Sequence, residues 1–123
     1  MLSVALSGEA SGPLLGDDLD LGAVNARSLS VDTGPQAALD ALLTELEART
    51  VDNQRIGINI SAHSRTLAPI PEKIGHYLRL ISLHPPQIPF TSNRSGQMIT
   101  EAEATNSDYW VSLLRGTAHI AIA

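Results

Sequence analysis

The residue whose type and surroundings most readily carry chemistry is His63. It follows a β-branched run over 58–60, and the small hydroxyl residues Ser61 and Ser64 lie close to it. A histidine at the end of a strand is held on a rigid base and can point into a cleft, and imidazole can accept a proton near neutral pH. One histidine is also a common loop residue, so this stretch alone leaves both interpretations open.

The other residues that could do chemistry give weaker signals. His76 lies on an expected helix and is interpreted as a surface residue, His84 precedes two prolines in a loop, and His119 has no motif around it. Four histidines without cysteine or spaced carboxylates argue against a metal site, so we expect neither a bound metal nor a bound cofactor. Tyr109 and Trp110 are interpreted as core anchors.

Length and composition restrict the class of protein. The 123 residues suffice for one compact domain, and a hydrophobic content of 43% with only 3% aromatic residues predicts an aliphatic core. A net charge of −5 argues against a general nucleic-acid binder, and the absence of cysteine excludes disulfides and thiolate nucleophiles. Because no signal peptide or membrane-spanning run is recognisable, we expect a cytoplasmic location with no membrane and no nucleic-acid partner.

The hydrophobic pattern over residues 1–61 predicts a small α+β unit. Strands are expected at 1–6, 19–24, 28–33 and 55–60. A short helical turn is expected at 7–9, and a longer helix at 35–49. In the third strand, Leu29 and Val31 are expected to face inward. This order is the ferredoxin-like β-α-β-β-α-β arrangement, an antiparallel sheet with both helices on one face. The apolar residues that share one face of the longer helix are Leu39, Leu42, Leu43 and Leu46.

Residues 62–123 carry a different pattern, a helix–strand–helix segment. Helices are expected at 72–82 and 109–115, and short strands at 88–91 and 97–100. A polar cap over 106–108 precedes the last helix. The sequence ends in an apolar stretch, so we expect the chain to have been cut from a longer protein.

Four stretches of the sequence fit motifs of a single family, in order and in register. Residues 21–35 fit "LAAVN…S…VSGP", 62–64 fit the end of "HAFHS" or "YASHS", 86–96 fit "P-x-IP-x-x-SN-x-TG", and 107–115 fit "DP-x-YW-x-x-x-LR". In these motifs the chain resembles the acyltransferase domain of modular (type I) polyketide synthases, which is like malonyl-CoA:acyl carrier protein transacylase. The agreement extends over nearly the whole chain, so the set is more specific than any one motif.

The resemblance implies both a fold and a reaction. Residues 1–61 correspond to a ferredoxin-like small subdomain, and residues 62–123 to the C-terminal portion of an α/β-hydrolase-like large subdomain. In this family a serine in a G-H-S-x-G turn takes a malonyl- or methylmalonyl-type extender unit from acyl-coenzyme A. The acyl group then passes to the phosphopantetheine thiol of an acyl carrier protein. The implied partners are that carrier protein and the remainder of the synthase, including its ketosynthase and the acyltransferase large subdomain.

The resemblance also assigns site residues. His63 takes the position of the general base that removes the serine proton. Leu113 takes the position whose main-chain carbonyl orients that histidine; the family usually has a polar side chain there, but a main-chain acceptor survives the change. The chemistry requires this pairing, because a serine hydroxyl needs an adjacent base and the second ring nitrogen must be held in the correct tautomer.

Two departures from the family pattern limit what the chain can do. No G-x-S-x-G sequence is present, since Ser11 in Gly8-Glu9-Ala10-Ser11-Gly12 is one residue out of register. We therefore expect a fragment that holds the base without its nucleophile and is inactive alone. The sequence over 60–63 matches neither "HAFH" nor "YASH", which leaves the extender unit open. The alternative is a non-catalytic ferredoxin-like module that binds a carrier protein or supports a multidomain assembly.

Overall fold

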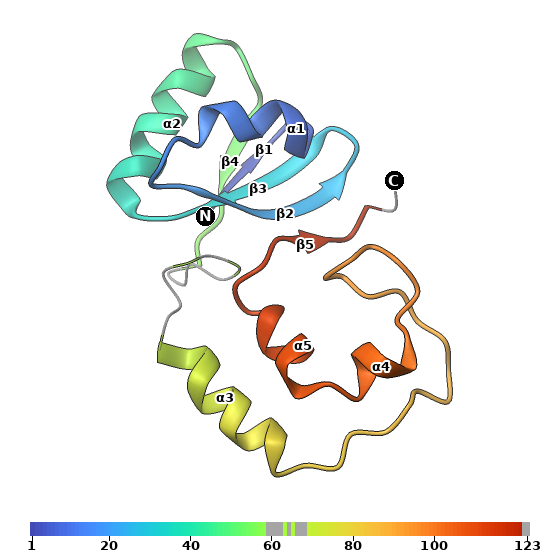
Figure 1. Cartoon of the computed structure of the whole chain (residues 1–123). Helices are drawn as coiled ribbons and strands as arrows, with labels where there is room; N and C mark the ends of the chain where they lie inside the picture. The colour runs from blue at the N-terminus through green and yellow to red at the C-terminus, as the bar shows by residue number, and fades with distance from the viewer. Residues whose placement is uncertain (59–62, 64, 66–68, 122–123) are drawn as a thin grey trace.

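The computed structural model describes residues 1–58, 63, 65 and 69–121. Its elements form two groups (Figure 1). In chain order they are β1 (Leu2–Val4), α1 (Gly8–Ser11), the 3₁₀ turn η1 (Gly12–Leu14), β2 (Asp20–Ala26), β3 (Leu29–Thr33), α2 (Gln36–Ala48), β4 (Asn53–Arg55), α3 (Pro69–Arg79), α4 (Glu101–Ala104), α5 (Ser107–Ser112) and β5 (Ala118–His119).

The strands form one sheet in the order β4-β1-β3-β2-β5. β1 pairs antiparallel with β3 and β4, and β2 pairs antiparallel with β3. These four strands with α1 and α2 are the ferredoxin-like arrangement, so the predicted α+β class is confirmed. The fifth strand was not predicted. β5 pairs parallel with β2, at Ala23 with Ala118 and Val24 with His119, and so connects the second group of elements to the sheet.

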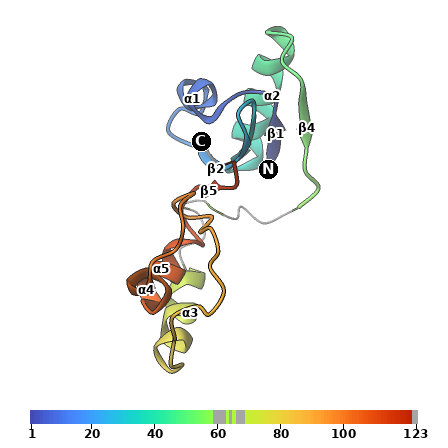
Figure 2. The ribbon, with the colours of Figure 1, turned by 90° about the vertical axis from the view of Figure 1, so that its right-hand side faces the viewer.

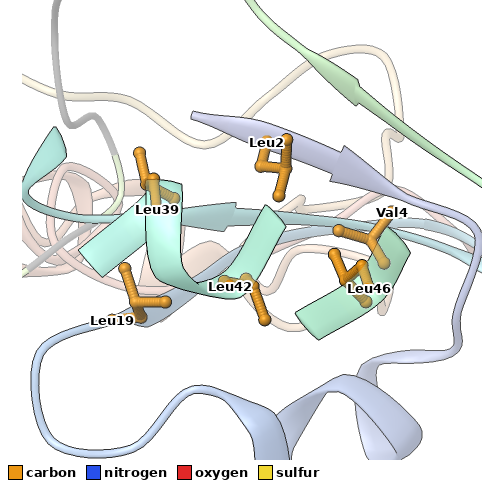
Figure 3. Packing of buried hydrophobic residues seen from close by; sticks show 6 residues of the cluster. All are labelled: Leu2, Val4, Leu19, Leu39, Leu42 and Leu46. Atoms are coloured by element: carbon orange, nitrogen blue, oxygen red, sulfur yellow. The ribbon is translucent and has the colours of Figure 1, made fainter. Parts of the chain in front are cut away.

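The core of the first group lies between α2 and the sheet. Figure 3 shows three leucines of α2 directed toward β1 and toward the residue before β2. Burying each of these side chains contributes about 1.5–3 kcal/mol, which makes this cluster the main source of stability in the unit. The helical spacing predicted from the sequence is confirmed at these positions. The buried cluster consists of Leu2, Val4, Leu19, Leu39, Leu42 and Leu46.

The turn into α2 depends on close backbone packing at Gly34. A Cβ atom at this position would lie 2.7 Å from Leu19 Cδ2 and 2.8 Å from Asp18 O, so no larger residue fits without displacing the chain. Pro35 then serves as the N-cap residue, and its carbonyl accepts the first helical hydrogen bond from Leu39 N at 3.1 Å. The predicted helix start is therefore displaced by one residue, because the proline itself is the cap.

The third strand is buried on both faces rather than on one, as a simple alternation would predict. Because Leu2 pairs with Asp32 and alternate residues share a face, Asp32 and Ser30 lie on the helix-covered side with Leu2. Both are fully buried, whereas Leu29 is 37% exposed. Val31 is buried on the other face, in a small cluster with Ala23 and Ala118. The prediction that Leu29 and Val31 face inward is therefore confirmed for Val31 and wrong for Leu29, which remains exposed at the start of β3.

The buried carboxyl of Asp32 should lower stability at neutral pH. Ser11 Oγ donates to Asp32 Oδ2 at 2.7 Å, while Oδ1 has no hydrogen-bond partner among the described residues. Burial raises the pKa of the Asp32 carboxyl above its usual value, against the smaller opposing effect of the Ser11 hydrogen bond. The folded state therefore holds the proton more tightly than the unfolded state. Consequently, ionisation at neutral pH costs stability, and protonation restores it as the pH falls through the folded pKa.

We expect Asp32→Asn to raise the free energy of unfolding at pH 7 by about 1 kcal/mol, the order of magnitude for a poorly compensated buried polar group. The gain should shrink as the pH is lowered and vanish below the unfolded aspartate pKa of about 3.9. Urea unfolding at several pH values measures this difference, with the exposed Asp52→Asn as the matched control. A loss of stability of equal size at every pH would contradict the account.

The second group of elements lies beyond the β2–β5 edge of the sheet, as both views show (Figures 1 and 2). α4 begins with a capping box, in which Thr100 Oγ1 accepts from Glu103 N and Glu103 Oε2 accepts from Thr100 N. Asn106 caps α5 by accepting from Asp108 N at 2.9 Å, at the cap predicted from the sequence. Trp110 Nε1 donates to Ala104 O at 2.9 Å and ties the two helices together.

Several predicted boundaries were wrong. The fourth strand lies at Asn53–Arg55 rather than 55–60, whose last two residues lie outside the described part of the chain. α3 begins at Pro69 because prolines are tolerated in the first turn of a helix, where their missing N–H costs nothing. The strands expected at 88–91 and 97–100 are reduced to a single bridge between Thr91 and Met98.

In the described residues, no helix is long and apolar enough to cross a membrane.

Candidate active site around His63

The backbone at His63 has an unusual conformation. Its φ is +57°, in the left-handed region that residues other than glycine rarely adopt. His63 N donates to Leu114 O at 3.2 Å, so the segment after α5 holds this backbone in place. Strained residues of this kind persist only where their surroundings fix them, and they cluster at functional sites. β4 ends at Arg55, and residues 59–62, where the sequence predicted a strand leading to His63, lie outside the described part of the chain.

The imidazole ring of His63 contacts two main-chain carbonyls. Nδ1 lies 2.8 Å from Leu113 O and 3.2 Å from Gly116 O. A carbonyl oxygen can only accept, so Nδ1 must carry the proton and donate it to them. The neutral ring then has its lone pair on Nε2. This is the tautomer in which a histidine acts as a general base through Nε2.

The two carbonyls are available because α5 ends just before them. Helix carbonyls in the last turn have no partner within the helix, and Leu113 is the C-cap residue of α5. Gly116 follows closely, and a Cβ there would lie 3.0 Å from the Arg94 guanidinium carbon and 3.2 Å from Ser112 O. Only the main chain of Leu113 is used, so its apolar side chain does not affect the contact. The structure thus brings together the two residues predicted for the site, His63 and Leu113.

A second set of contacts joins the chain just after His63 to β2. Asp20 Oδ2 accepts from Arg65 N at 3.0 Å, and Oδ1 accepts from Arg65 Nε at 2.9 Å. This arginine holds the pKa of the Asp20 carboxyl below its usual value, and Asp20 in turn raises the pKa of Arg65. Sequence analysis missed Asp20 and Arg65, because nothing in the pattern links residues 45 positions apart.

The remaining candidates lie elsewhere in the fold. Ser11 is the last residue of α1 and is fully buried against Asp32 of β3. His76 is exposed on α3 and meets Tyr77 edge to face, with ring centroids 6.0 Å apart. His119 lies on β5, where its main-chain N donates to Asn93 O at 2.6 Å. No group of three or more potential metal ligands occurs in the part of the chain that the structure describes.

Tyr109 has a polar contact that sequence analysis did not anticipate. Its hydroxyl is hydrogen-bonded to Ser92 Oγ, and Ser92 is 3% exposed. Ser92 N also donates to Gln97 O at 2.8 Å, which closes the turn over 92–97. This buried serine therefore fastens that turn to α5, the element whose C-terminal end contacts His63.

The profile of the family described as "Acyl transferase domain" matches residues 1–123. The chain belongs to this family. Its curated relatives include the polyketide synthase GfsB of Streptomyces halstedii, 32% identical over 120 residues, which are 95% of this chain and 2% of that protein. Erythronolide synthase EryA2 of Saccharopolyspora erythraea is 33% identical over 93 residues, which are 76% of this chain and 3% of that protein. The resemblance to polyketide synthase acyltransferases is thereby confirmed.

Solved acyltransferase structures agree in fold. The acyl transferase domain of SpnD, determined in complex with 2-(pent-4-yn-1-yl)malonyl, is 37% identical with a TM-score of 0.91. The match covers 96% of this chain and 29% of that domain. Malonyl CoA-acyl carrier protein transacylase from Burkholderia pseudomallei is 20% identical with a TM-score of 0.84, and the match covers 97% of this chain and 42% of that one. At this low identity, the similarity shows the fold alone. This acyltransferase chain thus spans less than half of each of these two solved chains.

Proposed function

We propose that these 123 residues supply the general base of a polyketide synthase acyltransferase. The complete enzyme transfers a malonyl- or methylmalonyl-type unit from coenzyme A to the phosphopantetheine thiol of an acyl carrier protein, in the cytoplasm. The observation that carries the proposal is the His63 ring, whose Nδ1 lies 2.8 Å from Leu113 O in a chain of this family. The same contact leaves Nε2 to accept a proton.

In this proposal His63 serves both halves of the reaction. Nε2 removes the proton from a serine hydroxyl as the serine oxygen attacks the acyl thioester, and the coenzyme A thiolate leaves with that proton. In the second half, Nε2 takes the proton of the carrier-protein thiol as its sulfur attacks the acyl-serine ester. The serine oxygen leaves and regains a proton from the imidazolium. The Leu113 carbonyl keeps the ring oriented and stabilises its charged form in both halves.

We further propose that the nucleophilic serine lies outside these residues, because the sequence contains no G-x-S-x-G. Residues 1–61 then form the small subdomain and 62–123 part of the large one. Two features support this division. The larger buried apolar cluster, between α2 and the sheet, consists of residues within 2–46. In addition, large apolar side chains on and after α3 are exposed to solvent, and we propose that further residues of the large subdomain cover them. The most exposed are Tyr77, Leu80, Ile81 and Ile88.

The proposal predicts that the 123-residue chain alone forms no covalent acyl adduct. Intact-mass analysis after incubation with malonyl-CoA and, separately, methylmalonyl-CoA should show only the unmodified mass, because a base without a nucleophile cannot be acylated. The same assay on a polypeptide that adds the upstream G-H-S-x-G region should show one acyl group. A stable adduct on the short chain would reveal a nucleophile within it and sink the proposal. Carrier-protein binding by residues 1–61, with no labelling of the longer polypeptide, would favour a non-catalytic module instead.

A further inference from the structure

We propose that Asp20 is a positioning residue for His63 and acts through Arg65. The inference rests on the proposed role of His63 as the general base. It assigns a catalytic consequence to Asp20 at the start of β2, whereas the His63 ring itself is hydrogen-bonded to Leu113 O and Gly116 O. The contacts that carry it come from Arg65 and from Thr117, which follows α5.

The Asp20 carboxylate binds both the main chain and the side chain of Arg65. Oδ2 accepts from Arg65 N at 3.0 Å, while Oδ1 lies 2.9 Å from Nε and 2.8 Å from Nη2. A bond to the side chain alone would leave the main chain of Arg65 free to move beneath its flexible side chain. The additional bond to Arg65 N fixes the backbone itself, two residues beyond His63. Two-point binding of this kind adds geometric specificity to the ion pair.

The same end of β2 also holds the segment that supplies the orienting carbonyls. Thr117 Oγ1 donates to Leu21 O at 2.7 Å, and Thr117 directly follows Gly116, whose carbonyl contacts the His63 ring. Asp20 and Leu21 are neighbours in β2, so this short stretch anchors both Arg65, two residues after His63, and Thr117, next to Gly116. The distance between the His63 ring and the carbonyls of Leu113 and Gly116 therefore depends on β2, which holds both segments.

The strained backbone of His63 explains why this anchor matters. At a φ of +57° the residue relaxes to an ordinary conformation unless its neighbours prevent it. His63 N is held by Leu114 O on one side, and Arg65 is held by Asp20 on the other. Without Asp20, Arg65 loses this anchor, and His63 can relax and withdraw Nδ1 from the Leu113 carbonyl. The preference for the tautomer with Nε2 unprotonated is then lost.

The ion pair is too exposed to act mainly on global stability. The Arg65 side chain is 59% exposed and that of Asp20 24% exposed, and pairs of this kind contribute little to the free energy of unfolding. A displacement of a catalytic group by about 1 Å can nevertheless slow a reaction by as much as a hundredfold. The loss of Asp20 should therefore be seen in the state of the His63 ring and in the rate, more than in the unfolding curve.

The test begins with the tautomer of His63 in the 123-residue chain, measured by ¹⁵N NMR of histidine-labelled protein at about pH 8, where imidazole is neutral. The parent should show Nδ1 protonated. Asp20→Ala should shift the ring toward the Nε2-protonated form, Asp20→Glu should restore part of the parent signal, and Arg65→Met should have an intermediate effect because the bond to Arg65 N remains. Asp40→Ala, which breaks the Arg55–Asp40 pair between β4 and α2, is the matched control and should leave the His63 signal unchanged.

The second readout is acyl transfer by the complete acyltransferase. Asp20→Ala should lower kcat about tenfold with little change in the KM for malonyl-CoA, since it displaces the base rather than the substrate. Asp40→Ala should not change kcat. If the Asp20→Ala and Asp40→Ala proteins show the same His63 tautomer and the same kcat, Asp20 does not position His63. If His63→Ala itself retains full activity, the proposed function fails, and the two failures are thereby told apart.

Discussion

Replacing His63 by alanine in the complete acyltransferase is expected to slow acyl transfer to the carrier protein about a thousandfold, within the usual range for loss of a general base. The reason is the ring geometry: Nδ1 donates to Leu113 O, and Nε2 is left to take the proton. Steady-state transfer from malonyl-CoA to a carrier protein measures the effect. The loss should appear in kcat for both half-reactions, because the same nitrogen serves each.

Two variants separate this effect from general damage. His76→Ala removes an exposed histidine of α3 and should leave the rate unchanged. Leu113→Asn alters the residue next to the ring but keeps its carbonyl, so it should retain most of the activity. A His63→Ala enzyme that is folded and within about threefold of the parent rate would contradict the base assignment, because a positioned general base contributes at least about a hundredfold.

Truncating Leu46 to alanine should destabilise the chain by about 3 kcal/mol, in the middle of the range for buried leucines. Leu46 has no exposed surface and packs with Leu2 and Val4 between α2 and β1 (Figure 3). The cost combines the lost burial of the side chain with the cavity left in an aliphatic core. Urea unfolding followed by circular dichroism gives the change in the free energy of unfolding.

The neighbouring Leu43→Ala provides the matched control. Leu43 lies on the same helix but is only partly buried at the margin of the core, so its truncation should cost about 1 kcal/mol or less. Equal costs at the two positions would contradict the placement of the core along the Leu39–Leu46 face. The comparison thus tests the assignment of residues 1–58 to a unit with its own core.

The regular parts of the fold could be predicted from local pattern. The leucine spacing over 39–46 indicated the face of α2, and the alternation of short strands and helices gave the ferredoxin-like order. The N-cap of α5 at Asn106 could likewise be predicted from neighbouring residues. The Thr100…Glu103 capping box was also visible in the sequence and could have revealed α4.

The features that could not be predicted from the sequence depend on partners distant in the chain. Asp32 faces the helices because of its register with Leu2 and its bond to Ser11, neither of which an alternating pattern contains. β5 is two residues long and exists only because β2 offers an edge. The bonds between Asp20 and Arg65 likewise arise from topology and not from any local motif.

The candidate site was reached through family motifs more than through physical pattern. His63 and Leu113 are 50 residues apart, and no periodicity connects them. The structure adds what motifs could not supply: the left-handed backbone of His63, the second carbonyl at Gly116, and the anchoring of the loop to β2. These three features explain in physical terms how one histidine can be held in a single tautomer.

The most direct test of the central claim is a single-turnover measurement of acyl-enzyme formation. The polypeptide carrying both the G-H-S-x-G serine and these 123 residues is mixed with malonyl-CoA and quenched over time, and intact mass reports the acyl adduct. The parent should accumulate one acyl group, and the His63→Ala variant should accumulate none over the same period. Equal rates of adduct formation in the two proteins would show that His63 is not the base.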